Sequence, residues 1–261
     1  MEYHRSVRWI RQQIDQYEPE EFTIPPSLVV LIADATYFGK RNEGFGTLVF
    51  WDHHHKRPIA FKHFEGTERK ADYLYLRQEI EVRGFTIQAV VIDGRKGIRE
   101  LFEDVPVQIC HFHQQAILTR YLTRHPKSQA ARDLKCIASY LGRVGSCRFS
   151  WLLKAWKKRH LAYFNEKTIH PETGRSRFTH KRLRRAYHSL ERNLPWLFTY
   201  RKHPKLKIPN TTNPLDGGLF SPLKKKINFH TGIRKSLKVK MIDIYLTNLA
   251  KQHSPASKKF H

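Results

Sequence analysis

The chain has 261 residues, of which 40% are hydrophobic and 12% aromatic, so it can bury a core as one large domain or two small ones. A formal charge of +25 argues against an enzyme of small neutral metabolites and favours a polyanionic partner. Its 3 cysteines cannot form a disulfide framework, and no apolar secretion signal opens the chain. The longest apolar-rich run, residues 28–33, is too short to span a membrane. We therefore expect a reducing compartment that contains nucleic acid.

The positive charge is confined to one part of the chain. Residues 1–104 hold 15 basic and 17 acidic residues, whereas residues 105–261 hold 33 and 6. Three basic runs with interleaved aromatic residues, at 154–160, 174–188 and 224–240, are typical of a surface that contacts a phosphate backbone. A membrane surface is the alternative, but no amphipathic anchor stands out. The expected nucleic-acid contacts are Lys154, Lys157, Lys158, Arg182, Arg184, Arg185, Lys224, Lys225, Lys226 and Arg234.

The first part of the chain alternates helical and extended patterns. Apolar residues at helical spacing predict a helix over 5–17, followed by a proline-rich linker. A β-branched apolar run predicts a buried strand over 28–34 that ends in Asp34. Further strands are predicted over 44–52 and 58–64, joined by a turn whose exposed histidines are His53, His54 and His55.

In the next segments, predicted helices alternate with predicted strands. We predict a helix over 68–83, a second buried strand over 85–93 that ends in Asp93, a short helix over 97–103 and a strand over 106–110. Residues 114–207 read as helical without any strand, with breaks that include Pro171, Gly174 and Pro195. A last core helix is predicted over 213–227 from leucines four residues apart, and residues 254–261 read as a disordered tail.

This order of elements matches a ribonuclease H-like α/β fold with a mixed five-stranded sheet and a large all-helical insertion. In that topology the first and fourth strands are neighbours, so the carboxylates of Asp34 and Asp93 would meet at the ligand-binding edge of the sheet. Oxygen ligands beside a basic surface suit two Mg²⁺ or Mn²⁺ ions, which support phosphoryl transfer.

Such a site needs a third acid, and few remain after residue 104. Asp216 fits best because Asn213 reads as an N-cap and Pro214 as the first helical residue, which places the carboxylate in a first turn where the helix dipole favours its ionised form. Gly217 and Gly218 lower helix propensity, which suits close approach of a ligand. The plain alternative is an acid at a helix start.

Four segments together resemble the catalytic domain of bacterial Mutator-like insertion-sequence transposases: LIADATYFGK, VVIDGRKGI, QICHFHQ and TTNPLDGGLFSPLKKKINFHTG. The resemblance spans residues 28 to about 240. It implies DNA cleavage and strand transfer with two metal ions held by Asp34, Asp93 and Asp216, Gly94 as the family's Asp-Gly partner, and Cys110 with His113 as its Cys-x-x-His pair. It also implies double-stranded DNA as partner, a homo-oligomer in the synaptic complex, and a cytoplasmic location near the bacterial nucleoid.

Two features depart from that family. Most relatives carry Glu as third acid, and Pro222 should kink the helix that carries Asp216. The upstream DNA-binding module is also expected to be missing, so that the chain is a fragment. The expected parts are a module remnant and linker (1–27), the first part of the core (28–113), the basic insertion (114–209), the closing core helix with the C-terminal helix (210–253) and the tail (254–261).

Other residues have competing interpretations. Cys110 and His113 have a zinc-ligand spacing, but no second pair accompanies them, so a structural or DNA-contacting role is favoured. Tyr37, Phe38 and Lys40 are candidate DNA contacts, although Tyr37 suits a core or rim position equally. Tyr187 within an arginine cluster is the one place that resembles a recombinase nucleophile, and that interpretation is weak.

The sequence thus predicts a DNA transposase core. An inactive DNA-binding remnant and a structure-selective nuclease of the same fold are the alternatives.

Overall fold

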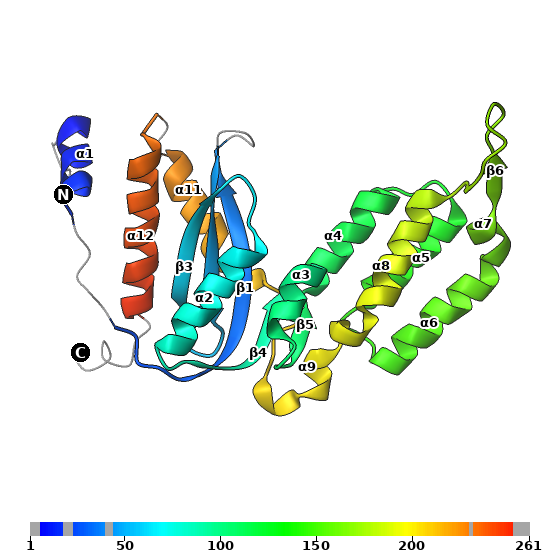
Figure 1. Cartoon of the computed structure of the whole chain (residues 1–261), viewed down its shortest axis with the longest axis horizontal. Coiled ribbons are helices and arrows are strands. Elements are labelled where there is room, and N and C mark those ends of the chain that lie inside the picture. Colours follow the sequence, from blue (N-terminus) through cyan, green and yellow to red (C-terminus); the bar gives the residue numbers. More distant parts are fainter. Residues whose placement is uncertain (1–5, 18–22, 40–43, 230–231, 253–261) are drawn as a thin grey trace. The chain divides into compact units, whose positions relative to one another are not determined.

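The computed structural model describes residues 6–17, 23–39, 44–229 and 232–252 (Figure 1). The chain forms two compact units, Met1–Gln88 with Asn213–His261, and Ala89–Thr212. The division falls inside one strand, β4 (Thr86–Ile92). None of the helices in the described part of the chain is long and apolar enough to cross a membrane.

Five strands form a mixed sheet, which confirms the predicted α/β class and the mixed five-stranded sheet. Its order is β3-β2-β1-β4-β5, with β1–β2 and β2–β3 antiparallel and β4–β5 parallel. The ribonuclease H-like identity of this sheet stays a prediction. The remaining strands are β1 (Leu28–Phe38), β2 (Phe45–Asp52), β3 (Arg57–Glu65) and β5 (Val107–Ile109).

β1 is longer than the pattern indicated. The apolar run from Val29 to Ala33 is buried, as expected of a strand covered on both faces. Asp34 was predicted at the end of this strand, but β1 continues to Phe38, and Asp34 pairs with Val49 of β2. The prediction was wrong because Thr36 and Phe38 have buried side chains, so the strand gains packing beyond the acid.

Helices α2 and α12 of the first unit cover the meander of β1, β2 and β3. Lys62 of β3 forms an ion pair of 3.0 Å with Asp72, and the next residue, His63, contacts Asp243 at 2.7 Å. Successive strand residues point to opposite faces, so α2 and α12 lie on opposite sides of β3. The helices of this unit are α1 (Val7–Gln16), α2 (Lys70–Val82), α10 (Asn213–Leu215), the π-helical turn η3 (Asp216–Phe220), α11 (Ser221–Phe229) and α12 (Lys235–Gln252).

The second unit is mostly helical, as predicted. Its core is aromatic: Trp156 stacks on Tyr187 at 5.3 Å between ring centroids and meets Phe164 edge-on. Pro195 was expected to break the helical pattern, yet α8 continues past it to Leu197. The elements are α3 (Lys96–Arg99), η1 (Glu100–Phe102), α4 (His111–Leu122), α5 (Gln129–Ser139), α6 (Ser146–Arg159), α7 (Leu161–Asn165), α8 (Lys181–Leu197), α9 (Thr199–Lys202) and η2 (Pro204–Leu206).

The prediction that residues 114–207 contain no strand was wrong, because this segment contains two strands. β6 (Lys167–Ile169) and β7 (Ser176–Phe178) form an antiparallel hairpin. The expected helix breaks, Pro171 and Gly174, lie in its loop, where Gly174 has a φ of +62° that favours glycine. The strands have three residues each, too few for a period-two pattern to stand out in the sequence.

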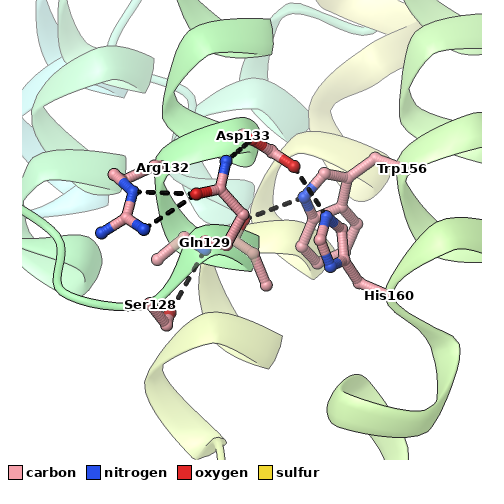
Figure 2. Close-up of polar contacts among 8 residues, drawn as sticks. Ser128, Gln129, Arg132, Asp133, Trp156 and His160 are labelled. Carbon is pink, nitrogen blue, oxygen red and sulfur yellow. Dashed lines mark hydrogen bonds and ion pairs between the residues drawn. The ribbon is translucent and has the colours of Figure 1, made fainter.

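A polar cluster fixes the start of α5 against the end of α6 (Figure 2). Asp133 accepts hydrogen bonds from Gln129 at 2.6 Å and from the ring of His160 at 2.8 Å. The indole N–H of Trp156 donates to the backbone oxygen of Ala130 at 2.9 Å. Burial raises the pKa of Asp133, but the hydrogen bonds from His160 and Gln129 lower it more, so the pKa lies below its usual value.

Replacing Asp133 with Asn should therefore destabilise the protein only above acidic pH. A carboxyl whose pKa is lower in the folded chain stabilises the fold above its unfolded-state pKa of 3.8, and that contribution is lost as the pH falls through the folded value. Urea unfolding at pH 7 and pH 3 measures the difference. The exposed Glu103→Gln variant is the control, and an equal loss at both pH values would contradict the assignment.

Two predictions fall outside the described residues: the DNA contact at Lys40, and the tail over 254–261.

Candidate functional site

The first acid, Asp34, is held in the middle of a buried strand. Its residue is only 8% exposed, and its Oδ1 accepts the backbone N–H of Ala35 at 2.9 Å. Neighbouring β1 residues differ in access: Tyr37 is 45% exposed, whereas Phe38 is buried and stacks on Phe45. Tyr37 thus has the exposure that a DNA contact requires, and Phe38 is a core residue rather than the predicted contact.

The predicted third acid, Asp216, begins a π-helical turn. The helix starts at Asn213, one residue earlier than predicted, and the single helix expected over 213–227 consists of α10, η3 and α11. The backbone N–H of Ser221 reaches the oxygen of Asp216, the five-residue spacing of a π-turn. Pro222 follows immediately, and because it has no backbone N–H it suits this irregular segment.

Gly217 and Gly218 are not required by the packing of the protein. A Cβ atom at Gly217 would meet nothing within 4 Å, and one at Gly218 would meet only the backbone oxygen of Asn213 at 4.0 Å. Both glycines are exposed. The side of the π-turn next to Asp216 is therefore open enough for a ligand to approach the backbone.

Asp34 and Asp216 are far apart in the sequence but adjacent in the first unit. One carboxylate oxygen of each lies within 4.8 Å of the other. Two carboxylates this close repel each other, and a bound cation would relieve that repulsion. Carboxylate oxygens are donors that suit Mg²⁺ or Mn²⁺, and binding of either ion here stays a prediction.

Asp93, the second predicted acid, belongs to the second unit and directly follows β4. Its Oδ2 forms an ion pair of 2.8 Å with Nε of Arg95, and its Oδ1 accepts the backbone N–H of Arg95. The following Gly94 has a φ of +89°, and a Cβ there would lie 2.9 Å from a methyl carbon of Ile109. Glycine is thus needed here for the chain to turn beside β5. Joint metal binding by Asp93 and the other two acids stays a prediction.

Cys110 and His113 lie at the start of α4. Cys110 is fully buried, and its Sγ accepts the backbone N–H of Thr212 at 3.2 Å. Burial raises the pKa of this thiol, but hydrogen bonds with His113 and Thr212 together lower it by more, so the pKa lies below its usual value. Among the residues that the structure describes, no group of three or more metal-ligand side chains contains Cys110. A structural role at the junction of α4 and the 210–212 segment fits these contacts better than zinc.

The predicted DNA contacts divide into exposed cations and cations used in packing. Arg184 lies 3.5 Å from the ring centroid of Phe178 and donates to the backbone oxygen of Phe164. Lys157 lies over the ring of Tyr187 and near Glu191. Those two cations stabilise the helical unit. Lys154, Lys158, Arg182, Arg185, Lys224, Lys225, Lys226 and Arg234 are exposed, although Arg182 donates to a backbone oxygen, Lys226 lies over Tyr245, and Arg234 pairs with Asp15.

Other groups that resemble catalytic sites are structural. Tyr187 is only 3% exposed, and burial followed by the charge of Glu191 raises its pKa to about 12, which is unsuited to a nucleophile. Thr47, His63 and Asp243 form a hydrogen-bonded chain at 2.8 and 2.7 Å, but the Thr47 side chain is fully buried. This chain connects β2 and β3 to α12 and offers no accessible nucleophile.

The turn histidines serve the fold, and their partner Asp52 was missed by the sequence analysis. Asp52 is fully buried and binds the ring Nδ1 of His55 at 2.5 Å. His54 and His55 are exposed, as predicted, but His53 is half-buried, and burial lowers its pKa. An Asp that directly precedes a turn is the sequence signal for such capping of backbone N–H groups.

A scan of the sequence against models of protein families gives no match, and a search among curated proteins gives none either.

Proposed function

We propose that the chain is the catalytic core of a DNA transposase that cleaves element ends and joins them to target DNA in the bacterial cytoplasm. The observation that carries this proposal is the approach of the Asp34 and Asp216 carboxylates in a chain of formal charge +25. Two hard oxygen ligands provide a cation site, and the excess of basic side chains provides an attraction for a polyanionic substrate.

Asp34 and Asp216, with Asp93, would hold two Mg²⁺ or Mn²⁺ ions, which when bound lower the pKa of water and offset charge on the phosphate. Asp34 contributes a carboxylate whose orientation is fixed by the Ala35 N–H. Asp216 contributes one from a turn that is open on its glycine side. The reaction is hydrolysis of a phosphodiester, which leaves a 3′-hydroxyl, followed by attack of that hydroxyl on a target phosphodiester with departure of a target 3′-oxygen. Assembly of two element ends would require more than one copy of the chain.

The test uses duplexes that carry the genomic flanks of the reading frame, incubated with the protein and Mg²⁺ or Mn²⁺. Cleavage with joined products supports a transposase. Cleavage without joining supports the alternative nuclease, and DNA binding without cleavage in either metal supports the inactive remnant.

Removing exposed cations from the helical unit should weaken binding to every duplex alike. The side chains of Lys154, Lys158 and Arg185 make no ion pair or hydrogen bond with the described residues, so their joint replacement by Ala removes charge without disturbing packing. We expect the plot of log K against log salt concentration to flatten by about 0.9 for each DNA phosphate that the variant no longer neutralises. Fluorescence anisotropy at several salt concentrations measures this slope, and an unchanged slope would place the DNA-binding surface elsewhere.

A further inference from the structure

The β6–β7 hairpin is an exposed extension of the second unit. In Figure 1 it extends beyond the helices of that unit, and in the chain it follows α7 and precedes α8. All residues of β6 are exposed, and Ile169 is 66% exposed. The hairpin buries almost no surface of its own, so packing of the unit does not explain why it extends outward.

Contacts at its base nevertheless fix the direction of the hairpin. Phe178, the last residue of β7, packs under the guanidinium of Arg184. The hydroxyls of Thr168 and Thr179 lie 2.7 Å apart, and the ring of His180 both binds Glu166 at 2.8 Å and stacks on Tyr163. A two-stranded ribbon alone is marginally stable, so these contacts are what hold it as a defined element.

One face of the ribbon carries its arginines. Thr168 is paired with Arg177 across the two strands, so both side chains lie on the same face. Arg175 directly precedes β7, and its backbone oxygen accepts the N–H of His170, which extends the ladder by one pair and places Arg175 on the same face as Arg177. Arg175 and Arg177 are exposed and make no side-chain hydrogen bond or ion pair with the residues that the structure describes. The one acid of the hairpin loop is Glu172, which is exposed.

A basic cavity of about 490 Å³ adjoins the base of the hairpin. Tyr163, Thr179 and His180 belong both to the cavity wall and to the base contacts. The cavity wall also has three cations, Lys127, Lys181 and Arg182, and the imidazole of His125. Positive charge thus continues from the ribbon face into a concave surface of the same unit.

From the arginine face and the adjoining cavity, we infer that the β6–β7 hairpin enters the major groove of duplex DNA while the phosphate backbone lies along the basic cavity. This inference rests on the proposed function, because it takes DNA as the substrate. The major groove is about 12 Å wide and admits a two-stranded ribbon, whereas the minor groove, about 6 Å wide, does not. Arginine is the side chain that most often reads guanine O6 and N7 there. The hairpin is thereby the part of the chain that selects DNA sequence.

The test compares Arg175→Ala/Arg177→Ala with a control of equal charge, Arg143→Ala/Lys205→Ala. The control residues are exposed, lie in the same unit outside the hairpin, and make no side-chain hydrogen bond or ion pair within the described part of the chain. We expect the hairpin variant to bind its preferred duplex at least about tenfold more weakly, while the control changes affinity only a few-fold. Glu172→Gln should tighten binding. Thermal midpoints should be unchanged, since Arg175 and Arg177 support no packing.

Dimethyl sulfate footprinting locates the groove, because the reagent methylates guanine N7 in the major groove and adenine N3 in the minor groove. The wild type should protect guanines at the site, and the hairpin variant should lose that protection. Loss of adenine protection instead, or binding and footprints equal to the wild type, overturns the inference while leaving DNA binding intact. If the wild type binds no duplex at all, the proposed function itself fails. If the hairpin binds a protein in place of DNA, the DNA footprint of the hairpin variant will equal that of the wild type, and this result also overturns the inference.

Discussion

Asp34→Asn is expected to abolish metal-dependent DNA cleavage and leave the fold intact. The substitution removes the ligand charge, but an amide oxygen still accepts the Ala35 N–H that orients the side chain. Loss of a residue that only orients a metal ligand costs about 10- to 100-fold, so loss of a ligand itself should cost more, at least about a thousandfold in cleavage rate. Asp216→Asn should behave in the same way. Asp216→Glu should keep part of the activity, since it retains the charge and changes only the reach.

Metal binding supplies a readout that is independent of cleavage. Mg²⁺ should raise the thermal midpoint of the wild type, because a ligand that binds only the folded state stabilises it. Both Asn variants should lose most of that gain.

The matched control is Asp243→Asn. It also removes a carboxylate from the first unit, but this carboxylate pairs with His63 and is not one of the predicted metal ligands. It should cleave DNA like the wild type. If Asp216→Asn also does so, the third acid is elsewhere, and Glu191 of α8 is the next candidate, although its contacts with Lys157 and His188 already engage it.

Asp52→Ala is expected to destabilise the protein by about 3–5 kcal/mol, the usual cost of removing one partner of a buried ion pair. Asp52 is fully buried, accepts the backbone N–H groups of His54 and His55, and lies 4.0 Å from Nε of Arg57. Arg57 is itself 2% exposed. Burial lowers its pKa, and the negative charge of Asp52 raises it by a smaller amount. Without Asp52, the guanidinium would be a buried charge with no counter-charge from this turn.

Urea unfolding measures this loss, and a double-mutant cycle separates its causes. Asp52→Ala/Arg57→Leu should recover part of the stability, because the second change removes the unpaired charge. Asp52→Asn should lie between the wild type and Asp52→Ala, since its side-chain oxygen can still accept backbone N–H groups. If Asp52→Ala costs less than about 1 kcal/mol, far below the usual cost for a buried pair, Asp52 is not the counter-charge that stabilises buried Arg57.

The sequence predicted the strands of the sheet because their β-branched runs are bounded by turns and polar residues. It misplaced the end of β1, because burial of Thr36 and Phe38 depends on packing that local composition does not record. It missed β6 and β7 because three-residue strands show no clear period. The π-turn was missed for another reason: a hydrogen bond over five residues has no sequence pattern of its own, and Gly217 and Gly218 suggested only an open helix start.

The acids of the candidate site were identified one by one from the sequence, and their joint role stays a prediction. Elimination among few acids led to Asp216, and one of its carboxylate oxygens lies within 4.8 Å of one of Asp34. The roles of Gly94 and Arg184 could not be read from the sequence. Gly94 is required by the closeness of Ile109, a residue of another element. Arg184 was predicted as a DNA contact but stacks on the ring of Phe178.

Because of the π-turn, the direction in which the Asp216 side chain points depends on how many residues lie between it and α11. Leu215, Leu219, Leu223 and Ile227 are all buried, although residues spaced by four drift around a straight α-helix. The wider turn at Asp216–Phe220 absorbs one residue between the start of the segment and α11. Deleting Gly217 or Gly218 would let the segment become an ordinary helix, and with α11 fixed by its leucines Asp216 would rotate by about 100°. Such a deletion could raise stability and still turn the carboxylate away from Asp34, so chain length at this point constrains the site as strongly as the acid itself.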